Sequence, residues 1–102
     1  MSWDVSLVKD GHEEIDCGNY TYNVSPMYRR AMGFTIGDLH RRSAADVAII
    51  LTDGIITLTN KPALYKEMNP ENGWGNYEGA INFLAQIVKN CLLYPDYELV
   101  VS

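Results

Sequence analysis

The stretch NPENGWGNYEGA, residues 69–80, separates two predicted helices and starts the longer one. Asn72-Gly73 favours a turn, and Asn76 can cap the helix that follows. That helix is predicted over about Tyr77 to Leu93, because its apolar residues recur at helical spacing. A turn needs no tryptophan, so Trp74 is either a large plug in the core or part of a binding site.

The N-terminal residues have the alternation typical of strands. Residues 3–8 alternate apolar and polar side chains, and Asp10-Gly11 favours a hairpin turn. A partner strand is therefore predicted at about residues 13–17. Gly18-Asn19 then predicts a second turn, followed by a short strand over residues 20–24, which are rich in aromatic and β-branched side chains.

Two helices are predicted in the middle of the chain. The first has Ser25 as its N-cap and Pro26 at its first position, and it ends at Gly33. The second follows the cap residue Ser43 and contains Gly54, which indicates a close crossing with another element. Its apolar residues surround most of the circumference, so we expect it to be buried on several sides. They include Ala48, Ile49 and Ile56.

The remaining segments complete an α+β domain. Residues 34–42 are predicted to be irregular or weakly turned, and Lys61-Pro62 opens a short helical turn. A last strand over residues 97–101 could pair with the first strand and bring the termini together. The sequence thus predicts a single domain spanning residues 1–102. In it, a small antiparallel sheet, made of the N-terminal hairpin and the C-terminal strand, packs against three to four helices.

Composition and charge exclude several classes of protein. Thirteen acidic residues against eight basic ones give a net charge of -5, which disfavours general nucleic-acid binding. No apolar run is long enough for a membrane span, and the first residues lack a signal-peptide pattern. We therefore expect a cytoplasmic protein in which Cys17 and Cys91 are reduced thiols.

Two stretches carry side chains suited to binding. In residues 69–80, helix-start amides and aromatic rings could form a small-ligand or anion site. In residues 19–33, tyrosines and asparagines precede two arginines, a combination that can stack on a ring and hold an anion. The alternative there is a tyrosine-rich strand followed by a helix with solvated arginines. The candidate binding residues are Tyr20, Tyr22, Asn23, Tyr28, Arg29, Trp74, Asn76 and Tyr77.

Patterns that indicate catalysis are sparse. His12, Glu14 and Asp16 would share one face of a strand and could hold a metal ion, but charged hairpin edges also prevent aggregation. Neither cysteine has a histidine at a diagnostic spacing, and no serine lies in a Gly-x-Ser-x-Gly turn. The sequence therefore indicates no catalytic residue, metal ligand or cofactor, and a non-enzymatic protein is the favoured interpretation.

Three motifs carry a resemblance to a known family. They are Trp-Asp-Val at residues 3–5, Asn-x-Thr-Tyr-Asn at residues 19–23 and Asn-Gly-Trp-Gly-x-Tyr-Glu-Gly at residues 72–79. In these motifs and in its terminal helix and strand, the chain resembles a family of small uncharacterised proteins of bacteriophages and prophages. Residues 34–59 match only in helical character. The resemblance implies a phage protein that acts in the bacterial cytoplasm, and it implies no activity.

Several functions remain open at this point. The favoured one is a non-enzymatic phage accessory protein that acts by binding in the host cytoplasm, with anti-defence as its purpose. It would either block a host protein through the tyrosine and arginine surface or sequester a signalling nucleotide. The protein could also form a homo-oligomer. The nucleotide would lie between Trp74, Tyr77, Tyr22, Tyr28 and Arg29. The alternatives are a small enzyme or metal-binding protein that uses His12, Glu14 and Asp16, and a phage structural or assembly protein.

These functions predict different surfaces. Sequestration requires residues 19–33 and 69–80 to converge in space. It predicts a concave pocket that contains Arg29 and Trp74 and lies at an oligomer interface. Partner binding predicts an exposed apolar or aromatic patch.

Overall fold

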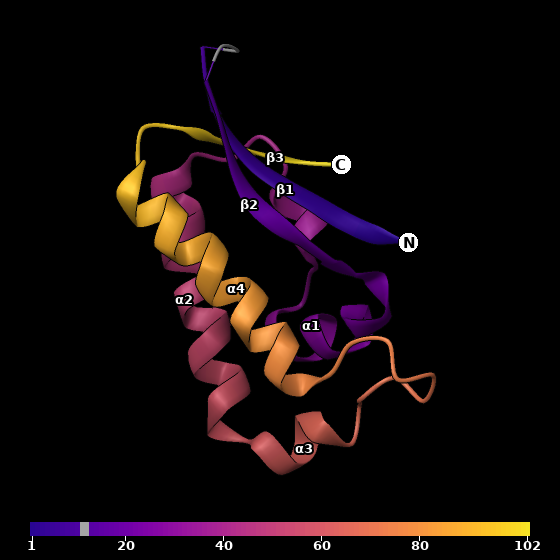
Figure 1. The fold of residues 1–102 in the computed structure, drawn as a ribbon. Coiled ribbons are helices and arrows are strands. Elements are labelled where there is room, and N and C mark those ends of the chain that lie inside the picture. Colours follow the sequence, from indigo (N-terminus) through magenta and orange to yellow (C-terminus); the bar gives the residue numbers. More distant parts are fainter. Residues whose placement is uncertain (11–12) are drawn as a thin grey trace.

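The computed structural model describes residues 1–10 and 13–102, so the metal-site candidate His12 lies outside the described residues. Within them the chain forms three strands, four α-helices and two short 3-10 segments (Figure 1). The elements are β1 (Ser2–Lys9), β2 (Glu13–Thr21), η1 (Tyr22–Val24), α1 (Ser25–Met32), η2 (Ile36–Leu39), α2 (Ala44–Asn60), α3 (Pro62–Lys66), α4 (Tyr77–Leu93) and β3 (Glu98–Val101). The predicted α+β class is confirmed.

The strands form one antiparallel sheet with the order β2-β1-β3. In β1, the apolar side chains of Trp3, Val5 and Leu7 are buried, as the alternation predicts. The predicted pairing of the first and last strands is also confirmed. Asp4 and Ser102 exchange two backbone hydrogen bonds of 2.9 Å, which places the two ends of the chain side by side (Figure 1).

The prediction of a turn at Gly18-Asn19 is wrong, because β2 runs through both residues. Val5 faces Gly18 and Ser6 faces Asp16, so Cys17 is an extra residue in a β-bulge. Gly18 has a φ of 97° and donates its N–H to the Asp16 carboxylate at 2.8 Å. A glycine with positive φ suits a bulge as well as a turn, which explains the error.

The bulge also changes the segment that follows. Residues 20–24 are not a separate strand, because Tyr20 and Thr21 complete β2 and the next three residues form η1. The Thr21 hydroxyl accepts a hydrogen bond from the Asn23 N–H at 3.2 Å and caps this 3-10 turn. The predicted cap Ser25 is instead the first residue of α1, and Val24 is the N-cap. The predicted end at Gly33, with a φ of 86°, is confirmed.

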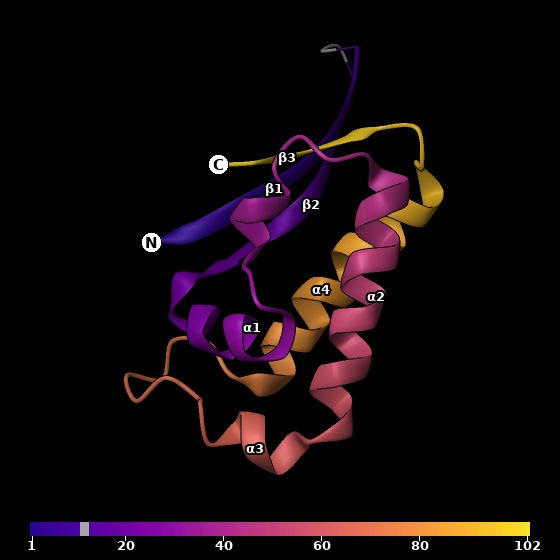
Figure 2. The ribbon, with the colours of Figure 1, turned by 180° about the vertical axis from the view of Figure 1, so that it is seen from behind.

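The two long helices, α2 and α4, lie side by side in both ribbon views (Figures 1 and 2). Ser43 caps α2 by accepting a hydrogen bond from the Asp46 N–H at 3.2 Å. The close crossing predicted at Gly54 is confirmed, because a Cβ there would lie 2.9 Å from Met32 Cγ of α1. Among the described residues, no helix is long and apolar enough to span a bilayer.

The core lies between the sheet and helices α1, α2 and α4. Two buried tyrosines join separate elements across it. Tyr28 of α1 donates its hydroxyl to the Ala80 carbonyl of α4 at 2.8 Å. Tyr77 of α4 donates its hydroxyl to the Leu58 carbonyl of α2 at 2.7 Å. A buried hydroxyl needs such a partner, so these two bonds fix how the helices pack.

Candidate functional site

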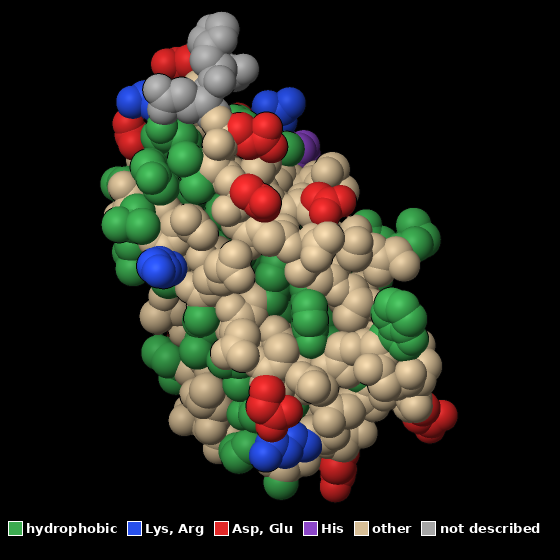
Figure 3. Space-filling view, in the orientation of Figure 1, with side chains coloured by type: hydrophobic (Ala, Val, Ile, Leu, Met, Phe, Trp, Pro, Cys, Tyr) green, Lys and Arg blue, Asp and Glu red, His purple; other side chains and the backbone are tan. Residues whose placement is uncertain are grey.

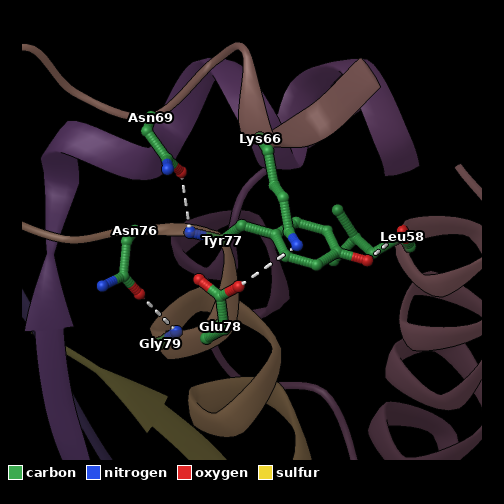
Figure 4. Close-up of polar contacts among 7 residues, drawn as sticks. All are labelled: Leu58, Lys66, Asn69, Asn76, Tyr77, Glu78 and Gly79. Carbon is green, nitrogen blue, oxygen red and sulfur yellow. Dashed lines mark hydrogen bonds and ion pairs between the residues drawn. The ribbon is translucent and has the colours of Figure 1, made fainter. Parts of the chain in front are cut away.

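Asparagine side chains fix the connection that leads into α4. Asn69 Oδ1 accepts a hydrogen bond from the Tyr77 N–H at 2.8 Å, and Asn76 Oδ1 accepts one from the Gly79 N–H at 2.7 Å (Figure 4). Asn72 Oδ1 accepts one from the Trp74 N–H at 3.0 Å. The asparagine-rich composition is thereby explained, because each side chain satisfies a backbone donor that would otherwise lack a partner.

Residues 69–80 converge in space with the end of β2. The Asn76 N–H donates to the Tyr20 hydroxyl at 3.0 Å, and Asn23 Nδ2 donates to the Trp74 carbonyl at 3.4 Å. Two glycines allow this approach. A Cβ at Gly79 would lie 2.7 Å from Tyr20 Cζ, and a Cβ at Gly75 would meet the Thr21 side chain at 2.6 Å. The spatial convergence that ligand binding required is therefore present.

A cleft of about 660 Å³ lies where the two stretches meet. We call it the Trp74 cleft, and define it by Asn19, Tyr20, Asn23, Asn72 and Trp74, which lie along its wall. Among the described residues that line it, none is an aspartate, glutamate, lysine or arginine. The cleft therefore offers an aromatic surface and amide groups without a side-chain charge.

Trp74 lies at the molecular surface with 70% of its area exposed, so the interpretation of this residue as a core plug is wrong. Gly73 and Gly75 have φ values of 76° and 93°, which only glycine adopts readily. They place Trp74 on a turn outside the core. The buried aromatic residue of this stretch is Tyr77.

The other candidate residues have different positions. Arg29 is exposed in the last turn of α1, and it does not line the Trp74 cleft. Tyr28 and Tyr77 are buried, and each donates a hydrogen bond to another helix. Burial raises the pKa of the Tyr28 hydroxyl. Tyr22 is half-buried, with its ring centroid 4.9 Å from that of Trp3. Of the eight candidates, Tyr20, Asn23 and Trp74 line the cleft, and Asn76 bonds to Tyr20 beside it.

The start of α4 is poorly suited to an anion. The N–H groups of Tyr77 and Gly79 already donate to asparagine side chains. Glu78 adds a carboxylate to the first turn and forms an ion pair of 3.6 Å with Lys66 (Figure 4). Lys66 Nζ also lies 5.6 Å from the centre of the Tyr77 ring. A phosphate here would have to displace these contacts.

Metal binding would use side chains of β2, and nucleophilic chemistry would use a cysteine of β2 or of α4. No group of three or more histidine, cysteine, aspartate or glutamate residues is placed to hold a metal ion in residues 1–10 and 13–102. Glu14 and Asp16 are exposed on β2. Cys17 and Cys91 are free and buried; burial raises their thiol pKa values to about 12 and about 11, away from the reactive thiolate.

Sequence reasoning missed a second surface. The expectation that α2 is buried on several sides is wrong for its outer side, where Ile49 is 73% and Ile56 is 52% exposed. On the neighbouring part of α4, Leu92 is 67% and Leu93 is 62% exposed. These four residues define what we call the α2–α4 face. The signal was present in the sequence, because a helix that is apolar around most of its circumference can have a second apolar face outside the core.

Comparison of the chain with protein-family models, curated proteins and solved structures gave no match. Functional inference therefore depends on the geometry of the described residues.

Proposed function

We propose that this protein acts by binding a protein partner through Trp74 and the cleft beside it. The observation that supports this proposal is a tryptophan 70% exposed on a connection held by side-chain hydrogen bonds. Tryptophan is among the residues most enriched at binding hot spots, because its side chain buries a large area and loses little rotamer freedom on binding. An anchored connection also loses little conformational entropy when a partner binds.

The chemistry of the cleft defines the kind of partner. Asn19, Asn23 and Asn72 bring amide groups, which can donate to and accept from a peptide backbone. Among the described residues that line the cleft there is no lysine or arginine, so no basic side chain there can pair with a phosphate. An uncharged segment of a protein surface, with a pocket for the Trp74 ring, fits this arrangement best.

The biological purpose that we propose depends on the resemblance to bacteriophage and prophage proteins alone. A phage accessory protein of this kind would act in the bacterial cytoplasm, and its partner would be a host protein. Inhibition of a host defence protein is then the proposed purpose.

A second candidate function is sequestration of a small ring-shaped ligand. The convergence of residues 19–23 and 72–75 on one cleft favours it, and about 660 Å³ lies within the usual range of small-ligand sites. Trp74 could stack on the ring while Asn23 or Asn72 bonds to its edge. Arg29 lies outside the cleft, so an uncharged ligand such as a nucleoside fits better than a nucleotide.

Capture from bacterial lysate tests the proposal. Immobilised wild-type protein is compared with Trp74→Ala and with Arg29→Ala, a surface control outside the cleft. We expect a protein that wild type and Arg29→Ala retain and Trp74→Ala loses. Equal retention by all three would overturn the role of Trp74. A thermal shift with nucleosides that disappears in Trp74→Ala, without any captured protein, would support the second candidate instead.

A further inference from the structure

The α2–α4 face is a largely apolar surface distinct from the Trp74 cleft. Ile49, Ile56, Leu92 and Leu93 are each more than half exposed. Figure 3 shows hydrophobic side chains along the left edge of the molecule, over α2 and the C-terminal half of α4. Such a patch on one side of a small protein usually marks an interaction site, because exposed apolar area costs free energy in water.

The face has relief that can receive a helix ridge. One groove, of about 850 Å³, passes over α2 from Met32 and Phe34 to Leu92, and it includes Ile49 and Ile56. A second groove, of about 550 Å³, lies between α2 and α4. Ridges beside grooves are the surface features by which helices interdigitate. The α2–α4 face therefore has both the ridges and the grooves that two packed helices need.

The charges on the face are complementary to one another. Asp53 lines the groove that reaches α1, and Lys89 lines the groove between α2 and α4. Both are exposed, and within the described part of the chain neither forms an ion pair. In a two-fold interface, one side of the patch meets the opposite side of the partner's patch. An acid on one side and a base on the other therefore make the face self-complementary.

We propose that the α2–α4 face is the interface of a homodimer. Two copies pack face to face about a two-fold axis parallel to the helices, with Ile49 and Ile56 in the grooves of the other copy. Asp53 lies opposite Lys89 of the partner subunit. This inference goes beyond the proposed function, because a dimer would present two Trp74 clefts.

The balanced charge of the α2–α4 face is compatible with a second copy. The chain carries a net charge of -5, while its grooved face carries one acid and one base among the described lining residues. Two copies can therefore meet there without net repulsion across the interface. The 17-residue helix α2 is about 25 Å long, so helices of two copies can pack along one another over that length.

Light scattering coupled to size exclusion, over a range of concentrations, tests the dimer. We expect wild type to reach twice its chain mass of 11.5 kDa, and Ile49→Lys to remain at the monomer mass with unchanged helical circular dichroism. Trp74→Ala is the control and should dimerise like wild type. A wild type that is monomeric at about 100 μM would overturn the proposal, and so would a dimer that Ile49→Lys leaves intact.

A charge exchange tests the two-fold arrangement itself. Asp53→Lys and Lys89→Asp should each weaken dimerisation about tenfold, because each places like charges opposite one another. The double variant restores opposite charges and should restore dimerisation to within a few fold of wild type. If the loss of dimerisation free energy in the double variant equals the sum of the losses in the two single variants, these residues do not face each other. That result would overturn the proposed geometry.

Discussion

The Tyr20 hydroxyl lies 3.0 Å from the amide nitrogen of Asn76, a residue 56 positions further along the chain. The hydroxyl also lies 3.4 Å from the Asn76 carbonyl oxygen, to which it donates. One side chain of β2 thus bonds to both backbone groups of the residue that caps α4. This contact joins the two halves of the Trp74 cleft.

Removing this hydroxyl should loosen the cleft. We expect Tyr20→Phe to lower the free energy of unfolding by about 1 kcal/mol, because the Asn76 N–H loses its protein acceptor. Urea unfolding measures the change. Tyr94→Phe is the matched control, since Tyr94 is a half-buried tyrosine whose hydroxyl forms no hydrogen bond within the described part of the chain. Equal effects of the two variants would contradict the role of the Tyr20 hydroxyl.

Gly79→Ala tests the close approach of Tyr20 to α4. Alanine inside a helix normally stabilises by up to about 1 kcal/mol relative to glycine. Here the new Cβ would lie 2.7 Å from Tyr20 Cζ, so the ring must move and its bond to Asn76 is lost. We expect net destabilisation of about 1 kcal/mol in urea unfolding. Gly37→Ala, whose Cβ would lie 3.8 Å from its nearest neighbour, should be close to neutral, and a stabilised Gly79→Ala would contradict the packing.

The two tryptophans should respond differently to solvent. Trp3 is buried in the sheet core, whereas Trp74 is 70% exposed. In a Trp3→Phe variant, the remaining Trp74 fluorescence should be quenched readily by iodide, and in a Trp74→Phe variant the Trp3 fluorescence should resist quenching. Trp74→Ala should change the free energy of unfolding by less than about 0.5 kcal/mol, as for other surface positions. Fluorescence of Trp74 that resists iodide would place it in the core after all.

The buried thiols predict how stability depends on alkaline pH. Burial raises the pKa of Cys17 from its ordinary value of 9.0 to about 12, and that of Cys91 to about 11. Above pH 9 the unfolded chain loses these protons before the folded chain does. Stability is therefore complete below pH 9 and falls as pH rises toward 11, by up to about 1.4 kcal/mol per pH unit for each thiol.

Urea unfolding at several pH values between 8 and about 10.5 measures this slope. The double variant Cys17→Ala/Cys91→Ala is the control, and it should show a shallower decline. The part that remains is expected from Tyr28, because burial raises its hydroxyl pKa as well. An unchanged slope in the double variant would contradict the assignment to the thiols.

Local signals were sufficient to predict much of the fold. The N-cap residues Ser43 and Asn76, the end of α1 at Gly33 and the helix from Tyr77 each depend on neighbours in sequence. The bulge at Gly18 was misread because positive φ serves turns and bulges alike.

The candidate site depended on relationships that the sequence does not encode locally. The contact between Tyr20 and Asn76 spans 56 positions, so spacing alone could not predict it. The exposure of Trp74 depends on Tyr77 filling the core near the start of α4, and the exposure of Ile49 depends on which sides of α2 receive neighbours. Composition suggested binding residues, and only the fold separates Trp74 from the buried tyrosines.

The affinity of a captured partner for wild type and for Trp74→Ala measures how much Trp74 contributes to binding. The dissociation constant would be measured by titration calorimetry at one salt concentration, with Arg29→Ala as control. A hot-spot tryptophan contributes at least about 2 kcal/mol, so we predict that Trp74→Ala weakens binding by roughly 30-fold or more while Arg29→Ala binds like wild type. Equal affinity of Trp74→Ala and wild type would contradict the proposal that this protein binds its partner through Trp74.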